Sequence, residues 1–525
     1  TAPGKTDGPW GIDDKALADQ ARTKLGIWPL DKHNVVLLNE VHPRNYEGQK
    51  PHEIYDLIAI GAGAGGLVTS RQSARRGAKS AMISEHLAGG DCLNVGCVPS
   101  KALIRSAKAV AEVRKASQFG VVLPPGEIKV DFKAVMERLR EIRATIAPAD
   151  GHGGTEKAGA HVFQGRGRFT GPDTVEVNGQ ELKFKKCVVA TGGRPFIPDI
   201  PGLKDAPFTT NEQLFNLEAL PPRMMIIGAG VIALEMAQSF ALLGSKVTVL
   251  NRSSRLFQSK GGDKEAAELM QSLLEKDGVQ FINSAAVSSV ATINQQGASP
   301  DDFPLMSVKV GEQDLECECL IVATGRLANV EDLGLDKAGV EYKLGKGIVV
   351  DDLTASVSNP NVYAVGDCVA DVPRLTHMSG EMAKMVVQNA LAGDDWKLSS
   401  LVVPAVAYTH PEYATVGIAS EDMAAKKGIE VDVYRTGLEH NDRAITDGFR
   451  YGFCKTIVEK GTQKILGATI VAERAGEMVN EVSLAIKNDL GLHAIGRNIH
   501  SYPTTGECVQ FCGVNYINQN LPRLD

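Results

Sequence analysis

A glycine-rich turn between two short apolar strands constrains this chain more than any other feature. The apolar run 54–60 leads directly into Gly61-Ala-Gly63-Ala-Gly65-Gly66, a helical stretch to Arg76 follows, and the second strand, 79–84, ends at Glu85. Glycines at these spacings permit a tight turn and bring a pyrophosphate close to a helix N-terminus, while the acid accepts hydrogen bonds from a ribose. Gly61, Gly63, Gly66 and Glu85 therefore predict a dinucleotide-binding βαβ unit.

The same arrangement occurs a second time. The strand 224–227 precedes Gly228-Ala-Gly230-Val-Ile-Ala233, and a helix to Leu243 and the strand 246–250 follow. Two such units predict two dinucleotide sites. Here Asn251 stands where the acid would be, so a 2′-phosphate meets no repulsion, and Arg252 and Arg255 are available to pair with it. This pattern favours NADPH, and the alternative is that both arginines belong to a solvated loop.

Length and composition limit the remaining classes. The 525 residues predict three or four domains, and a net charge of −7 without basic clusters argues against a nucleic-acid partner. No apolar run approaches the roughly 18 residues needed for a membrane span. Nine scattered cysteines do not form a disulfide scaffold. The expected fold class is α/β, with two Rossmann-like units.

Residues 1–52 precede the first unit and read as a polar N-terminal extension. Asp13 or Asp14 is a candidate cap for one helix, Leu17, Ala21 and Leu25 form its apolar stripe, and Gly26 is its expected end. A flexible tether is the alternative, and a docking arm for a larger assembly is a further hypothesis. A start at Thr1 is compatible with removal of a targeting peptide, hence with an organellar protein, although the compartment stays open.

Two cysteines five residues apart follow the first unit. Cys92 and Cys97 lie near an expected helix start, where the helix dipole lowers thiol pKa values, and Lys101 follows one turn later. The pair is a candidate redox-active disulfide, whereas two buried structural thiols are the commoner explanation of such a spacing. Thiol chemistry of this kind suits a reducing compartment.

Three strand ends add further candidate contacts. Val188-Val-Ala-Thr191-Gly192 and Ile321-Val-Ala-Thr324-Gly325 are similar turns, each expected where the chain crosses between a nucleotide-binding unit and its neighbour. Asn361-Val-Tyr-Ala-Val-Gly366-Asp367 ends in an acid suited to a sugar or ribityl hydroxyl.

Together these motifs resemble the FAD-dependent pyridine nucleotide–disulfide oxidoreductases, over about residues 53–520. The resemblance implies an FAD-binding domain (53–200 and 328–398), an NAD(P)H-binding domain (201–327) and a C-terminal α+β dimerisation domain (399–525) in a homodimer. It implies that FAD lies on Gly61, Gly63, Gly66, Glu85, Thr191, Gly192 and Asp367, and NADPH on Gly228, Gly230, Ala233, Arg252, Arg255 and Gly325. Cys97 would face the flavin, Cys92 would exchange electrons with the acceptor, and Lys101 would pair with Glu235.

The C-terminal region departs from the pattern of the disulfide-reducing members. Aligned on Pro503 and Glu507, the place of their catalytic His is taken by Tyr502, and His500 comes two residues too early. A phenol with a pKa near 10 does not shuttle protons at neutral pH as an imidazole near 6.5 does. Mercuric reductases also carry a Tyr in this region, so they are the better match, although residues 1–91 contain no cysteine for their metal-binding domain.

Cys508 and Cys512 follow Glu507 and would share one face of a helix. The pair is a speculative soft-metal or relay site near the partner subunit, and two small core residues are at least as good an interpretation. Cys187, Cys317, Cys319, Cys368 and Cys454 lie in strand-like contexts and are interpreted as structural.

The leading interpretation is an NADPH-dependent flavoenzyme that passes electrons through Cys92 and Cys97 to a metal ion or another small acceptor. A dihydrolipoamide dehydrogenase-like disulfide reductase is the alternative, disfavoured by Tyr502 and Asn251. An assembly subunit that keeps the fold is a third hypothesis.

Overall fold

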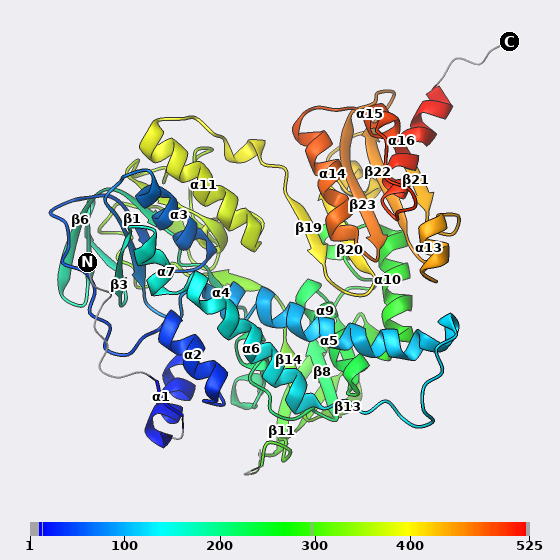
Figure 1. Cartoon of the computed structure of the whole chain (residues 1–525), viewed down its shortest axis with the longest axis horizontal. Coiled ribbons are helices and arrows are strands. Elements are labelled where there is room, and N and C mark those ends of the chain that lie inside the picture. Colours follow the sequence, from blue (N-terminus) through cyan, green and yellow to red (C-terminus); the bar gives the residue numbers. More distant parts are fainter. Residues whose placement is uncertain (1–9, 13, 296, 298, 521–525) are drawn as a thin grey trace.

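The computed structural model describes residues 10–12, 14–295, 297 and 299–520. Three sheet-bearing parts are arranged around a pair of long helices (Figure 1). None of the described helices is long and apolar enough to cross a bilayer.

The first sheet has seven strands in the order β3-β2-β1-β6-β5-β4, and β18 pairs with β6. β1, β2, β3 and β18 run parallel to their neighbours, whereas β4, β5 and β6 form an antiparallel meander. Helices α3 (Ala64–Arg75) and α11 (Thr376–Ala392) pack side by side. The strands are β1 (Tyr55–Ile60), β2 (Ser80–Ser84), β3 (His161–Gln164), β4 (Arg168–Gly171), β5 (Thr174–Val177), β6 (Gln180–Val189) and β18 (Val362–Ala364).

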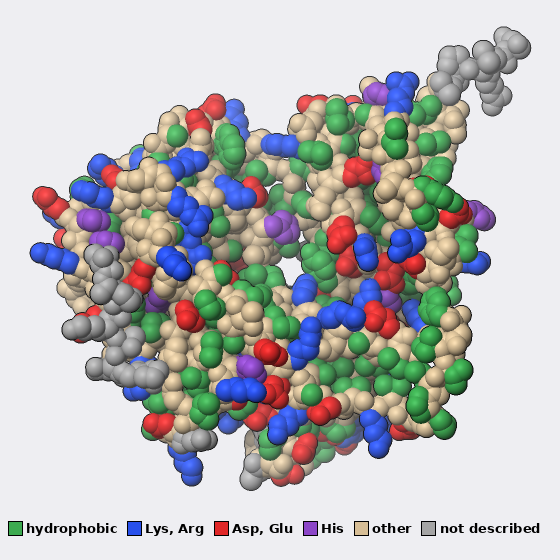
Figure 2. Space-filling view, viewed as in Figure 1, with side chains coloured by type: hydrophobic (Ala, Val, Ile, Leu, Met, Phe, Trp, Pro, Cys, Tyr) green, Lys and Arg blue, Asp and Glu red, His purple; other side chains and the backbone are tan. Residues whose placement is uncertain are grey.

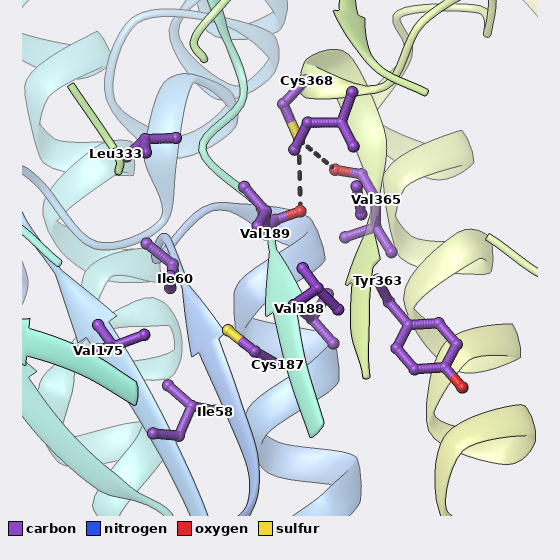
Figure 3. Close-up of a cluster of buried hydrophobic side chains, with 14 of the residues drawn as sticks. Ile58, Ile60, Val175, Cys187, Val188, Val189, Leu333, Tyr363, Val365 and Cys368 are labelled. Atoms are coloured by element: carbon purple, nitrogen blue, oxygen red, sulfur yellow. Dashed lines mark hydrogen bonds between the residues drawn. The ribbon is translucent and has the colours of Figure 1, made fainter. Parts of the chain in front are cut away.

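The core of this first part is apolar and continuous. Figure 3 shows Ile58, Val188 and Tyr363 from three neighbouring strands among its buried side chains. Cys187 and Cys368 belong to the same core, and the Cys368 thiol donates to the Val189 carbonyl at 3.3 Å. Both cysteines therefore have the structural role expected of them.

The second parallel sheet, in the order β10-β9-β8-β14, repeats the βαβ design. Its strands are β8 (Arg223–Ile227), β9 (Lys246–Asn251), β10 (Val279–Asn283) and β14 (Cys319–Val322), and its helices are α9 (Val231–Leu243) and α10 (Lys264–Lys276). An antiparallel sheet of β11 (Val287–Asn294), β12 (Leu305–Val310) and β13 (Gln313–Cys317) lies within the same stretch of chain. Cys317 and Cys319 are both buried here.

The C-terminal part is a five-stranded sheet in the order β19-β20-β23-β22-β21. Its strands are β19 (Pro404–Ala407), β20 (Glu412–Gly417), β21 (Val431–Gly437), β22 (Phe453–Glu459) and β23 (Ile465–Ala472). Its helices are α12 (Glu421–Lys426), α13 (Asp442–Thr446), α14 (Ala475–Lys487), α15 (Leu492–Arg497) and α16 (Glu507–Asn520). α14 is amphipathic and buries Met478, Val479 and Val482.

Two long helices, α5 (Cys97–Lys115) and α6 (Phe132–Asp150), lie in the chain between β2 and β3 and share a core with the second part. α5 begins at Cys97 and packs along α9, so that Leu103 and Phe240 share one core. The short elements between these helices and sheets are α4 (Gly90–Asn94), α7 (His152–Lys157), α8 (Asn211–Leu214), β7 (Gly193–Pro195), β15 (Arg326–Ala328), β16 (Tyr342–Lys343) and β17 (Gly347–Ile348).

The described part of the N-terminal extension is folded onto the body. α1 (Lys15–Leu25) is capped by Asp14 and ends at Gly26, as expected from the sequence. α2 (Lys32–Val41), which was not expected, packs along α6 (Figure 1). Since Trp10 and Leu37 are buried in a shared core with Leu67 of α3, the flexible-tether alternative is wrong for this part of the chain.

Candidate functional site

A cleft of about 1190 Å³ lies where the carboxyl ends of the first sheet's strands meet α5, α9 and β19. Figure 2 shows the surface hollowed at the centre of the molecule, between the part that carries α11 and the C-terminal sheet. Ligands of open parallel sheets bind at this edge, and a pocket for a drug-sized ligand measures roughly 300–1,000 Å³. The cleft therefore suits a long ligand such as a dinucleotide.

The first glycine turn is shaped for a pyrophosphate. Gly61 has a φ of 118°, and a Cβ there would overlap the Ala190 carbonyl. A Cβ on Gly66 would overlap the Gly61 carbonyl, so helix α3 can approach β1 only without side chains at these places. At Gly63, the N-cap of α3, a Cβ would reach only the Gly90 Cα at 3.7 Å, which leaves the helix N-terminus open for phosphate.

Two carboxylates mark the other contacts expected for FAD. Glu85 follows β2 and pairs with Arg166 at 2.8 Å. Asp367 pairs with Arg326 at 3.2 Å, and burial raises the pKa of Asp367 while Arg326 lowers it. Arg326 also pairs with Asp91, the residue before Cys92. This arginine thus links the expected ribityl contact to the start of the redox motif.

The turn at Thr191 and Gly192 lies between these groups. The Thr191 hydroxyl donates to the Asn329 carbonyl at 2.6 Å, and Gly192 has a φ of 69°. Both residues line the cleft, as do Glu85 and Asp367. The open glycine turn, the two carboxylates and the cleft's size together fit FAD.

Cys92 and Cys97 lie together on the cleft wall. Cys92 is on α4, Cys97 is the first residue of α5, and their thiols are hydrogen-bonded. The bond from Cys92 is the largest influence that lowers the pKa of Cys97, to about 6, and the Thr376 hydroxyl, 3.2 Å from the sulfur, lowers it further. The pKa of Cys92 is raised by the same bond and by burial. Cys97 is therefore the thiolate of the pair at neutral pH, and Cys92 the protonated thiol.

Half-buried Lys101 and buried Glu235 form a charge pair beside these thiols. The Lys101 ammonium lies 2.9 and 3.1 Å from the two carboxylate oxygens of Glu235, whose side chain is 3% exposed. The Tyr408 backbone N–H donates to Glu235 at 2.9 Å, and the Lys101 ammonium lies 4.4 Å from the centre of the Tyr408 ring. Lys101 lowers the pKa of Cys97 and Glu235 raises it, so the effects of the two charges on this pKa oppose each other.

The second glycine turn has the same design at the edge of the second sheet. Gly228 has a φ of 112° and no room for a Cβ next to the Ala323 carbonyl, whereas nothing lies within 4 Å of a Cβ on Gly230. Ala233 is buried in α9, and Gly325 is exposed beside the turn, with a φ of 143°.

Asn251 and the two arginines lie at the end of β9. Asn251 is buried and donates to Asn283 at 2.8 Å, so its amide supports the turn. Arg252 is exposed, whereas Arg255 donates to the Gly262 carbonyl at 2.9 Å and pairs with Asp422 at 2.8 Å. Of the two candidates for a 2′-phosphate, Arg252 has the accessible side chain.

The C-terminal candidates lie away from the cleft of their own chain. Tyr502 is 71% exposed, and its hydroxyl donates to Asp442 at 2.7 Å. Glu507 accepts from the Thr504 backbone N–H at 3.0 Å, at the start of α16. His500 is held between Glu481, at 2.9 Å, and the Asn498 carbonyl.

Cys508 and Cys512 are fully buried in the core of the C-terminal part. Their thiols are hydrogen-bonded to Cys454, and the Cys512 thiol also donates to the Cys454 carbonyl at 3.4 Å. Within the described residues, no group of three or more His, Cys, Asp or Glu side chains could hold a metal ion. This burial fits the interpretation as small core residues, and the soft-metal site stays a prediction.

Comparisons with known proteins agree with this geometry. Residues 55–383 match the pyridine nucleotide-disulphide oxidoreductase family, and residues 403–511 match the dimerisation domain of the same family. The chain belongs to this family. It is therefore a flavoprotein oxidoreductase whose family members use FAD and NAD(P)H, and its dimerisation domain supports a homodimer.

Relatives with two different activities are similarly close. Dihydrolipoyl dehydrogenase of Chlamydia muridarum is 33% identical over 87% of this chain and 95% of its own length. Mercuric reductase of Lysinibacillus sphaericus is 31% identical over 92% of this chain and 84% of its own. Among solved structures, the HOCl-induced flavoprotein disulfide reductase RclA of Escherichia coli is 25% identical with a TM-score of 0.76, covering 87% of this chain and 99% of that one.

Several residues that line or adjoin the cleft of this oxidoreductase were not predicted from the sequence. Thr376 is 279 residues from Cys97 and belongs to no motif. Tyr408 is placed by β19, and Arg326 follows an expected turn but reaches both Asp91 and Asp367. Lys24 to Gly26, at the end of α1, also line the cleft. Among these residues, Arg326 had a sequence signal that could have pointed to the cleft, because it directly follows the Ala-Thr-Gly turn.

Proposed function

We propose that this protein is an NADPH-dependent flavoprotein that delivers electrons through Cys92 and Cys97 to a soft metal ion, as a substrate. The observation that carries the proposal is a thiolate-ready cysteine pair in a family member with Tyr502 where disulfide reductases have His. Bound FAD would supply the transfer of two electrons from the nicotinamide to the thiols.

The cleft residues have separable tasks in this chemistry. Cys97 is kept as a thiolate by Cys92, Thr376 and Lys101, so it needs no other base. Cys92, nearer the start of the motif on α4, is the thiol that passes electrons outward. Lys101 and Glu235 hold fixed opposite charges that do not require water to reorganise around the sulfur.

The missing imidazole favours a metal ion over a disulfide. Reduction of a disulfide releases a thiolate that an acid must protonate, and such help contributes roughly 10²–10⁴-fold. His500 does not replace it, because both of its ring nitrogens are engaged by Glu481 and Asn498. A soft metal ion is bound by thiolates directly and needs no such proton transfer.

The names of similar proteins support a metal substrate without deciding it. Mercuric reductases recur among the relatives, and an RclA structure with 24% identity is described as a Cu(II) complex. Dihydrolipoyl dehydrogenases, at 32–33% identity, are as similar to this chain as the mercuric reductases, at 31–32%. Disulfide reduction is therefore the second candidate function.

NADPH is proposed as the preferred nucleotide, since Asn251 carries no charge and Arg252 is free to approach a 2′-phosphate.

The FAD domain would combine 53–200 with 328–398, the NADPH domain would be 201–327, and 399–525 would form the dimer. In that dimer, Tyr502 and Glu507 would act on the partner's thiols.

Steady-state turnover across acceptors tests the proposal. Purified holoenzyme is assayed with NADPH and Hg(II) in excess small thiol, and separately with glutathione disulfide and with lipoamide. The wild type should turn over Hg(II) and reduce both disulfides poorly, while Tyr502→His should raise disulfide reduction and lower Hg(II) turnover. Tyr502→Phe is the matched control, because it removes the hydroxyl without adding an imidazole. Rapid disulfide reduction by the wild type would overturn the metal assignment and favour the second candidate.

A further inference from the structure

The N-terminal segment (residues 10–12 and 14–46) contacts the FAD cleft through the C-terminal end of α1. Lys24, Leu25 and Gly26, at the C-terminal end of α1, line the cleft in company with Glu85 and His86. The His86 side chain is hydrogen-bonded to the Lys24 backbone. The end of α1 thus forms a wall beside the acid expected to bind the FAD ribose.

Helix α2 supports the connection that runs from Glu85 to the redox motif. The Ala88 backbone N–H donates to the Val41 carbonyl at 2.9 Å, and the His42 ring lies 3.3 Å from the His86 carbonyl. Ala88 precedes Cys92 by four residues. The backbone between the ribose acid and the first cysteine is therefore bonded to the N-terminal segment at two places.

A fully buried arginine makes the third connection. Arg143 on α6 donates to the Asn94 carbonyl at 2.8 Å and to the Asn34 side chain of α2 at 3.0 Å. Asn94 lies between Cys92 and Cys97, and its own amide donates to the Ala88 and Gly90 carbonyls. Because a buried charge without partners is costly, Arg143 holds α2 and the redox motif in one arrangement.

A further contact holds the end of α1, where it lines the cleft. Asn216, which is 1% exposed, donates to the Gly26 carbonyl at 2.8 Å and accepts from the Trp28 backbone N–H at 3.5 Å. Asn216 belongs to the stretch that leads into the second sheet and does not line the cleft. The stretch of the segment that lines the cleft is therefore also bonded to the chain that leads into the second sheet.

We propose that the N-terminal segment is an integral part of the FAD site, which closes the cleft beside Glu85 and holds the connection between Glu85 and Cys92. The same contacts bury the apolar stripe of α1, Leu17, Ala21 and Leu25, so this face is not available to dock an external partner. Loss of the contacts that hold the segment against the body should weaken FAD binding more than it lowers the stability of the protein without FAD.

Two variants and a matched control test this proposal. Ala21→Glu places a carboxylate on the buried face of α1, and Ala16→Glu makes the same change on its exposed face. Asn216→Ala removes the hydrogen bonds to Gly26 and Trp28 without substituting any residue that lines the cleft. Each protein is stripped of FAD, retitrated by flavin fluorescence, and melted with and without FAD.

Ala21→Glu and Asn216→Ala should each bind FAD about tenfold or more weakly, and the rise in Tm caused by FAD should shrink. Ala16→Glu should match the wild type in both measurements. The proposal is overturned if the variants that fold keep wild-type FAD affinity. It is also overturned if the Tm of each variant falls by the same amount with and without FAD. Should Ala21→Glu fail to fold, Asn216→Ala alone decides.

Discussion

The hydroxyl of Thr376 is the contact to Cys97 that is simplest to remove without changing the shape of the cleft. It lies 3.2 Å from the Cys97 sulfur and lowers the pKa of that thiol, which is about 6. Thr376→Val keeps the side-chain volume and deletes the donor. A hydrogen bond to a charged group contributes roughly 1.5–3 kcal/mol, and 1.36 kcal/mol corresponds to one pKa unit, so the pKa of Cys97 should rise to roughly 7–8.

The assay is a pH titration of the thiolate-to-flavin charge-transfer absorbance in enzyme reduced by two electrons. Thr376→Val should shift its midpoint upward, and absorbance at pH 7 should fall because less Cys97 is ionised. Thr376→Ser is the control, since it keeps the hydroxyl and should titrate near the wild type. An unchanged midpoint in Thr376→Val, or an equal shift in both variants, would refute the assignment of this hydroxyl as the donor.

Three other expectations follow from the same geometry. In the same titration, Glu235→Gln should lower the pKa of Cys97 and Lys101→Met should raise it, because the two charges act in opposite directions on the thiolate; shifts of the same sign would contradict this. Arg252→Ala should reduce kcat/KM for NADPH on the order of tenfold and leave NADH nearly unchanged, and an unaltered ratio would exclude Arg252 as the phosphate ligand. Cys97→Ser should keep FAD but lack the charge-transfer band, whereas Cys92→Ser should show it even when oxidised; the reverse pattern would exchange the two roles.

Local sequence patterns predict the parts of this fold whose determinants are close together in the chain. The glycine turns at Gly61 and Gly228 are set by steric exclusion of a Cβ against the adjacent strand, which a spacing pattern captures. Asp14 and Gly26 delimit α1 for the same reason, since caps act over one helical turn.

Contacts that depend on tertiary packing lie beyond such patterns. Thr376, at the start of α11, contacts Cys97, at the start of α5, across 279 residues of chain, and no local sequence signal marks it. Arg143 reads as an ordinary surface residue of an amphipathic helix, yet it is fully buried between α2 and the redox motif. For Cys508 and Cys512, the helical i, i+4 spacing leaves both a core role and a site role open, because it does not reveal which face of the helix is buried.

The most direct test of the central claim is whether Cys92 carries electrons from NADPH to a metal ion. Anaerobic wild-type enzyme should take up about two equivalents of NADPH per subunit, one for FAD and one for the cysteine pair. Mixed with Hg(II) and excess small thiol, it should then release about one elemental mercury for each NADPH oxidised, since both reactions involve two electrons. Cys92→Ser should retain FAD, accept only about one equivalent and release no mercury. Mercury release at the wild-type rate by Cys92→Ser, or none by a wild type that accepts two equivalents, would contradict the account.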